Sequence, residues 1–380
     1  MDNQKLIEIN RRHLGIICLC ILGIILIAGL WPRTFNNKND AILLPDAKGI
    51  RFSGRGIIYT RSSLKYPSPA SIPGALTIEL AVQPNKEFGS SLPIILAIND
   101  EKPCERLLIG QWKKHLIIRS RRTSCFQSGY YGEIDIENAL PKGKEQFITI
   151  ASGKDGTILY VNGTSVKRYR NFSILKPGEV LSGRLILGNS STGNHSWEGS
   201  ISALAIHDRF LSSDEILRHY EAWRDHGSLS LEENKLPISL YRFIERTGSV
   251  IKDHSGQGND LIIPERLTPL RREMLTPPWR DFQATLRYAR DVAINILGFI
   301  PFGFYVTWYL SVKGVTRLSV VIMVLVLGIG TSLSIEIIQA YLPERTSQMV
   351  DVITNVSGTA IGIYLCFFYI LPRRTTDSKQ

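Results

Sequence analysis

The sequence predicts a mixed membrane protein, in which an all-β sandwich of two sheets is joined to a four-span α-helical transmembrane bundle. Four apolar runs are long enough to cross a bilayer as helices, which takes roughly 20 residues each. Between the first two runs, short apolar stretches alternate with clusters of Gly, Asn, Asp and Pro, a pattern typical of strands joined by turns. The chain has 380 residues, 44% of them apolar, so it has room for one sizeable soluble domain beside the spans.

The spans divide the chain into membrane and soluble parts. Residues 14–30 follow a basic segment, residues 1–13, as a signal peptide would. No small-x-small cleavage site precedes Trp31, so we interpret this first span as an uncleaved anchor. The other spans are expected at about residues 291–310, 318–342 and 352–371, followed by a tail at residues 372–380.

Basic residues predict the orientation of the spans. They lie in the N-terminal segment, in the link between the second and third spans (Lys313 and Arg317) and in the tail (Arg373 and Arg374). The positive-inside rule places all three segments in the cytoplasm. The sequence therefore predicts a multi-pass protein of the plasma (inner) membrane, with cytoplasmic termini and an extracytoplasmic soluble domain.

Polar residues gather at the outer ends of the last three spans. They are Asp291, Asn295, Glu336, Gln339, Arg345, Asp351 and Asn355. Spacings of three and four residues put their pairs on common helix faces, and the orientation puts all of them in the outer leaflet. Ionisable residues at this depth usually face a bundle interior or a wet cavity, which favours a binding site. The alternative is that they only pack the spans, each pair contributing about a kcal/mol or less.

The same residues form an ordered motif over residues 290–371. It reads Asp291-x3-Asn295-x3-Phe299-x-Pro301-x-Gly303, then Glu336-x2-Gln339, then Arg345-x5-Asp351-x3-Asn355-x2-Gly358-x3-Gly362. This motif resembles the VanZ-like membrane family. Gln348 departs from it, because many members have an acidic residue there. The family is named for low-level glycopeptide (teicoplanin) resistance and has no established reaction, so the resemblance implies a role in the cell envelope.

Residues 45–224 carry the pattern of the β-sandwich. Short apolar runs lie at residues 76–82, 92–98, 107–109, 116–118, 147–151, 158–161, 184–187 and 201–206. Such runs with turns between them predict two packed sheets. Asn162-Gly163 predicts a tight hairpin turn, because both residues accept positive φ.

Several of these runs also resemble a known domain. The strand Leu76 to Pro84, the hairpin Ile158 to Gly163 and the closing segment Trp197 to Ile216 are similar to concanavalin A-like, laminin-G-type (LamG) domains. Such domains most often bind glycans or proteins, and some are spacers. The resemblance allows calcium as a cofactor of the sandwich, but no cluster of acidic residues marks a metal site.

Cys104 and Cys125 flank two strand-like runs joined by a turn. Opposed positions on such a hairpin can meet disulfide geometry, and the outside of a cell is oxidising. We therefore expect either a disulfide or two buried thiols. Cys18, Cys20 and Cys366 lie within spans and act as small apolar residues.

Residues 225–289 are a connector whose role the pattern leaves open. Parts of it resemble the opening strands of a LamG domain, although they follow its close. We hypothesise a permuted strand pair that completes the sandwich; the alternative is a short independent hairpin on the membrane. Asp253 and Asp260 fit Asx-turns better than a calcium site.

Ligand residues in the soluble domain are few. Tyr130 and Tyr131, between glycines in a loop-like segment, are candidates for stacking on a sugar, whereas Trp197 fits the core. No Ser/His/Asp set, Cys/His metal spacing or phosphate loop is present in this part of the sequence. A translocated domain has no access to nucleic acid, so nucleic-acid partners are excluded.

These observations predict an envelope protein with two binding elements. The sandwich is expected to bind an envelope glycan or protein, and the seven polar residues to hold a membrane lipid or the headgroup of a lipid-linked glycan. A rival interpretation is an intramembrane enzyme acting on a lipid-linked precursor, with Glu336 or Asp351 as general acid or base. A third is a structural membrane scaffold.

Overall fold

The computed structural model divides into two compact units, Asn36–Arg271 and Met1–Phe35 with Arg272–Gln380. The residues that the structure describes are 3–31, 38–44, 49–66, 74–89, 91–125, 127, 129–226, 236–282, 285–342 and 345–370. The predicted tail at residues 372–380 lies outside them.

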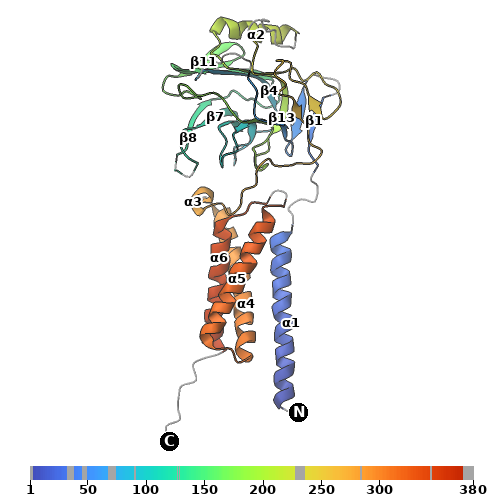
Figure 1. Cartoon of the computed structure of the whole chain (residues 1–380), viewed down its shortest axis with the longest axis vertical. Coiled ribbons are helices and arrows are strands. Elements are labelled where there is room, and N and C mark those ends of the chain that lie inside the picture. The colour runs from blue at the N-terminus through green and yellow to red at the C-terminus, as the bar shows by residue number, and fades with distance from the viewer. Residues whose placement is uncertain are drawn as a thin grey trace. The chain divides into compact units, whose positions relative to one another are not determined.

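The first unit is a β-sandwich of two eight-stranded sheets (Figure 1). The first sheet has the order β1–β2–β13–β4–β9–β10–β11, and β14 pairs with β13. Its strands are β1 (Ala41–Leu43), β2 (Ile50–Ser53), β4 (Leu76–Pro84), β9 (Gln146–Gly153), β10 (Gly156–Val161), β11 (Thr164–Tyr169), β13 (Glu198–His207) and β14 (Ser239–Tyr241).

The second sheet has the order β15–β16–β3–β12–β5–β6–β7–β8. Its strands are β3 (Ile58–Thr60), β5 (Ile94–Asn99), β6 (Leu107–Trp112), β7 (His115–Arg121), β8 (Tyr131–Ile136), β12 (Arg184–Leu187), β15 (Val250–Ile251) and β16 (Leu261–Ile262). Each predicted strand-like run coincides with an observed strand, apart from residues 92–93, which precede β5, so the two-sheet fold class is confirmed.

The two sheets pack around one apolar core. Trp197 is fully buried in it, and its indole Nε1 donates a hydrogen bond of 2.7 Å to Gln111 Oε1 on β6. This bond satisfies the ring's polar atom inside an apolar environment. At the surface, Asn162 and Gly163 turn the β10–β11 hairpin with φ of 51° and 75°.

The segment after residue 235 contributes strands to both sheets. β14 runs antiparallel to β13, with Tyr241 opposite Leu204. β15 and β16 form a hairpin whose second strand pairs with β3, with Leu261 opposite Thr60. The sandwich therefore extends beyond the predicted end at residue 224, and this segment is part of its sheets rather than a separate hairpin.

Helix α2 (Ser213–His226) covers the outer face of the first sheet (Figure 1). Beneath it Glu79, from β4, is completely buried and meets two histidines. His207 Nε2 lies 3.0 Å from one Glu79 oxygen, and His219 Nδ1 lies 2.9 Å from the same oxygen. Burial alone would raise the pKa of Glu79, but the hydrogen bonds and charges of His207 and His219 lower it to about 2. The carboxylate is therefore ionised inside the domain and joins α2 to the sheet.

The second unit is helical. Its helices are α1 (Asn3–Leu30), α3 (Pro278–Asp281), α4 (Leu286–Val312), α5 (Arg317–Gln339) and α6 (Met349–Tyr369). Four of these described helices, all but α3, are long and apolar enough to cross a membrane. They contain the four predicted spans, apart from a few end residues.

Glycines let α4 and α6 approach closely. A Cβ atom at Gly358 would lie 2.2 Å from the carbonyl oxygen of Ile296, and one at Gly362 would lie 2.2 Å from that of Ile300. On the other side, a Cβ at Gly303 would lie 2.1 Å from the carbonyl oxygen of Thr359. Backbone therefore meets backbone along this interface, as is typical of small residues between membrane helices.

Glu79→Gln tests the buried charge beneath α2. We expect it to lower the free energy of unfolding at pH 7 by about 3 kcal/mol, because a pKa lowered from 4.5 to about 2 corresponds to that difference. The contribution of the Glu79 carboxylate to stability is complete above pH 4.5 and is lost as the pH falls toward 2. On acidification the free energy of unfolding of the wild type should therefore approach that of the variant. Urea unfolding of the full chain in detergent, followed by tryptophan fluorescence, measures both effects.

Glu133→Gln is the matched control, because Glu133 forms an exposed ion pair with Arg119 at 2.5 Å. An exposed pair contributes at most about 1 kcal/mol. A Glu79→Gln protein as stable as the wild type at pH 7 would contradict the assigned role.

Gly358→Ala tests the contact of α4 with α6. The added methyl group forces the two backbones apart, which should destabilise the helical unit by about 1–3 kcal/mol. Gly330→Ala is the control, because Gly330 is exposed on α5 with open space around it. Thermal unfolding in detergent, monitored by size-exclusion chromatography, compares the two variants. Equal unfolding midpoints for Gly358→Ala and Gly330→Ala would refute the close contact.

Candidate functional site

All seven polar residues predicted to form a pocket line one cavity of about 360 Å³ in the helical unit. α4 supplies Asp291 and Asn295, α5 supplies Glu336 and Gln339, and α6 supplies Asp351 and Asn355. Arg345 lies in the link between α5 and α6, and the end of α1 adds Gly29. The spacings of three or four residues turn each pair toward the same side of its helix, which is why the three helices converge here.

Two carboxylates inside the cavity have fixed partners. Glu336 is 1% exposed, and its Oε2 accepts a hydrogen bond of 2.7 Å from the backbone N–H of Gln348. Asp351 Oδ1 accepts a hydrogen bond of 2.8 Å from Asn295 Nδ2 on α4. Gln348, whose side chain departs from the family motif, thus contributes its backbone N–H, a group that any residue except proline has. The third carboxylate, Asp291, is exposed and lies 3.5 Å from Arg290.

Gln339 and Arg345 hold the end of α1. Gln339 Nε2 donates to the carbonyl oxygen of Gly29 at 2.7 Å. Arg345 donates to the carbonyl oxygen of Trp31 through Nη2 at 2.7 Å and through Nε at 3.2 Å. The last carbonyls of a helix have no partner within it, so these side chains satisfy groups that would otherwise be unpaired in the membrane.

Asn355 has one polar atom without a partner. Its Nδ2 donates to Ser332 Oγ on α5 at 2.9 Å, while its Oδ1 is buried and accepts no hydrogen bond from the described residues. The residue is 5% exposed. A buried amide oxygen without a donor costs free energy, so a ligand that brings a hydroxyl or an N–H group to it would be stabilised.

The link that borders the cavity is itself held in place. The backbone N–H of Thr276 donates to the carbonyl oxygen of Ser347 at 2.9 Å, and that of Met349 donates to the carbonyl oxygen of Thr276 at 3.0 Å. Leu275 N–H donates to Ser347 Oγ at 3.0 Å. These bonds fix the residues between Arg345 and Asp351, so this wall of the cavity is preorganised.

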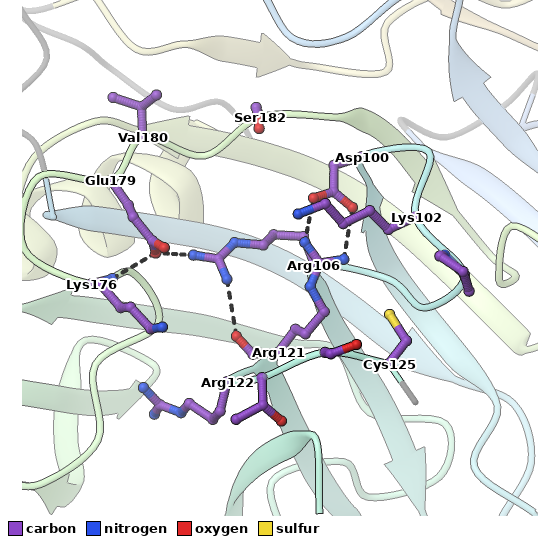
Figure 2. Close-up of a pocket in the computed structure, with 13 residues that line it drawn as sticks. Asp100, Lys102, Arg106, Arg121, Arg122, Cys125, Lys176, Glu179, Val180 and Ser182 are labelled. Carbon is purple, nitrogen blue, oxygen red and sulfur yellow. Dashed lines mark hydrogen bonds and ion pairs between the residues drawn. The ribbon is translucent and has the colours of Figure 1, made fainter. Parts of the chain in front are cut away.

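The sandwich contains a second cavity, of about 580 Å³, that the sequence analysis missed (Figure 2). Its charged lining consists of Asp100, Lys102, Arg106, Arg121, Arg122, Lys176 and Glu179. These residues come from three separate stretches of chain that no local motif connects. The one signal in the sequence was the concentration of arginines beside the two cysteines.

Cys104 and Cys125 form a disulfide bond at the edge of this cavity. Tyr130 and Tyr131, the residues expected to stack on a sugar, are half-buried and their rings lie 4.5 Å apart. Tyr131 donates to the carbonyl oxygen of Glu105 at 3.2 Å, and neither tyrosine lines the cavity.

Two groups of side chains have the composition of a metal site. Glu79, His207 and His219 bring potential ligand atoms within 4.8 Å of one another, a set that the sequence analysis did not find. In the structure they bond to each other, as described for α2. Asp253 and Asp260 accept hydrogen bonds on three of their carboxylate oxygens from backbone N–H groups, and the fourth pairs with Lys252 at 2.7 Å. That is the geometry of a turn rather than of a cation site.

Comparisons with known proteins find two families in the chain. Residues 242–371 match the family model VanZ/LLP1, and residues 63–217 match the model of the concanavalin A-like lectin/glucanases superfamily. No curated protein matches the chain.

Solved structures share low identity with the chain. A protein described as carbohydrate-binding from Bacteroides ovatus is 14% identical, with a TM-score of 0.40, over 59% of this chain and 61% of its own. The binding domain of Botulinum neurotoxin DC, in complex with rat synaptotagmin II, is 15% identical, with a TM-score of 0.37, over 49% of this chain and 45% of its own. A SAP-like pentraxin from Limulus polyphemus is 13% identical, with a TM-score of 0.37, over 58% of this chain and 95% of its own. The chain thus spans less than two thirds of the first two.

The family matches agree with the residues that first indicated them, and with the sheets and helices of the structure. The protein is a multi-pass membrane protein that joins a concanavalin A-like, laminin-G-type β-sandwich to a VanZ-like helical domain.

Proposed function

We propose that this protein acts in the cell envelope and that its helical cavity holds the polar headgroup of a membrane lipid or of a lipid-linked glycan. In this proposal both termini are cytoplasmic, the cavity lies in the outer leaflet, and the sandwich lies outside the plasma membrane, where it binds an envelope glycan or protein. The unpartnered Oδ1 of Asn355, buried in a cavity lined by three carboxylates, carries the proposal. Charged residues within a bundle usually mark a ligand pathway or site.

The charges of the cavity indicate what the headgroup contains. Asp291, Glu336 and Asp351 are acidic, and Arg345 is the one basic residue among the described residues of the lining. An ammonium or hydroxyl group suits the carboxylates and the amide oxygen of Asn355, because both groups donate hydrogen bonds. A phosphate on the same ligand suits the guanidinium of Arg345. The cavity is therefore best suited to a headgroup with a hydrogen-bond donor beyond its phosphate.

A second candidate function is an intramembrane enzyme, which the placement of Glu336 and Asp351 in one cavity favours. Two carboxylates with different partners can divide the roles of general acid and base. In that case Glu336→Gln should abolish turnover of a lipid-linked precursor while keeping its binding. If the protein only binds the precursor, the wild type should show no turnover, so Glu336→Gln would have none to lose.

Native mass spectrometry of the full chain in gentle detergent tests the headgroup. The wild type should retain a phospholipid or lipid-linked glycan, and Arg345→Ala should lose most of it, because the phosphate then has no cationic partner. Lys313→Ala is the control, since Lys313 lies at the opposite end of α4 and outside the cavity lining. Absence of bound lipid from a folded wild-type protein would instead support a scaffold whose polar residues only pack the spans.

The disulfide tests the proposed orientation. Cysteines stay reduced in the cytosol and pair outside it, so Cys104 and Cys125 should be oxidised in intact cells. A variant with Cys18, Cys20 and Cys366 changed to Ser leaves this pair as its one source of thiols. After thiols are blocked in living cells and the protein is denatured, a maleimide–polyethylene glycol reagent should shift its mass only if a reductant is added. Blocked thiols on both cysteines would place the sandwich in the cytosol and refute the orientation.

A further inference from the structure

The cavity of the sandwich lies where three connecting segments meet (Figure 2). They are the link from β5 to β6, the residues after β7, and the link from β11 to β12. Its volume, about 580 Å³, is within the range of sites for small ligands and is large enough for a sugar unit. Hydroxyl groups of Thr123, Ser124 and Ser182 add neutral hydrogen-bonding partners to its charged lining.

Two arginine–carboxylate pairs form the rigid frame of the cavity. Arg121 pairs with both oxygens of Asp100, through Nη1 at 2.8 Å and through Nη2, and also donates to the carbonyl oxygen of Cys104 at 2.9 Å. Arg106 pairs with Glu179, and its Nη1 donates to the carbonyl oxygen of Arg121 at 3.0 Å. Because these arginines are largely buried and engaged on several sides, they fix the walls rather than remain available to a ligand.

The disulfide reinforces the frame at Cys125, which lines the cavity. It joins Cys104, whose carbonyl oxygen accepts from Arg121, to Cys125, which follows Arg122 by three residues. The chain between Arg121 and Cys125 is therefore held at both ends.

Three basic side chains of the described lining are not held in a close ion pair: Lys102, which interacts with Asp100 at longer range, and Arg122 and Lys176, which interact with Glu179 in the same way. Arg122 is half-buried, and its guanidinium carbon lies 4.3 Å from the centroid of the Phe172 ring. Burial lowers the pKa of Arg122 and the nearby charge of Arg106 lowers it further, while the charge of Glu179 offsets only part of this. Because Glu179 compensates the charge of Arg122 only in part, an anion beside this guanidinium would stabilise it further.

The sum of the charges in the lining indicates the sign of the ligand's charge. Among the residues that the structure describes, five basic and two acidic residues line the cavity, so the net charge of this lining is 5 − 2 = +3. A planar guanidinium stacked on an aromatic ring presents its N–H groups in the geometry that carboxylate and phosphate oxygens accept. The two lysines add attraction for an anion at longer range.

We propose that this cavity binds the carboxylate or phosphate group of an anionic glycan, with Arg122 as its direct partner. This inference rests on the proposed function in one respect, that the sandwich binds a glycan, and it specifies the class of glycan and the residues. The paired arginines position the walls, and Lys102 and Lys176 attract the anion.

Binding of defined oligosaccharides to the full chain in lipid nanodiscs tests this inference by isothermal titration calorimetry. The probes are a uronic-acid oligosaccharide, a phosphate-bearing oligosaccharide, a neutral glucan of similar length and a poly-glutamate peptide. At least one anionic oligosaccharide should bind, and the identity of the binder distinguishes a carboxylate from a phosphate. Its affinity should fall steeply with salt and at least tenfold in Arg122→Gln, which removes a charge-assisted hydrogen bond.

Two further variants make the result specific. Lys102→Gln combined with Lys176→Gln changes exposed side chains, so it keeps the fold and should weaken anion binding several-fold. Arg168→Gln removes an exposed charge from β11, outside the cavity, and should leave the affinity unchanged.

Other outcomes overturn the inference in different ways. Equal affinity in Arg122→Gln and wild type would exclude the assigned residue. Equal binding of the neutral glucan would exclude the anionic class and leave a glycan role for the sandwich. Binding of the acidic peptide alone would replace the glycan by a protein partner. Binding of no probe would refute the anionic ligand and the glycan role of the sandwich together. Lipid retention in the helical cavity is measured separately, so its failure is distinguishable from each of these results.

Discussion

A polar group without a partner inside a bilayer costs several kcal/mol, and this constraint determines how the helical unit is assembled. Asn295 meets Asp351 across α4 and α6, Gln348 meets Glu336, and Gln339 meets the end of α1. These bonds need closely spaced helices, which the glycines facing Ile296 and Ile300 allow. Asn355 Oδ1 is buried and has no donor among the described residues, and the proposed headgroup would supply one.

The sandwich meets the same constraint with charges instead of amides. Glu79 is ionised at complete burial because two histidines bond to it, and Arg106 and Arg121 are buried because each has a carboxylate. The two cavities therefore differ in the sign of the net charge of their lining. In the part of the chain that the structure describes, the helical cavity is lined by three acidic residues and one basic residue, whereas the cavity of the sandwich is lined by two acidic and five basic residues. Their proposed ligands differ accordingly, a donor-bearing headgroup in one and an anionic sugar in the other.

The family match and the physical unit do not share a boundary. The VanZ/LLP1 match begins at residue 242, yet β15 and β16, within that match, pair with each other and with β3 of the sandwich. The sandwich unit continues to Arg271. Removal of the VanZ-like match would therefore also remove strands of the second sheet.

The sequence alone determined the spans, the strand-rich region and the seven polar residues of the helical cavity, because these depend on hydropathy and on spacing along one helix or strand. It also indicated the Asn162-Gly163 turn, which depends on two adjacent residues. Tertiary structure decided what depends on distant segments. Asp100, Arg122 and Glu179 meet at one cavity, and Glu79 meets His207 and His219, only because antiparallel sheets bring separate strands and links together. No local pattern records such contacts, since their spacing in the sequence reflects the topology of the fold rather than the period of a helix or a strand.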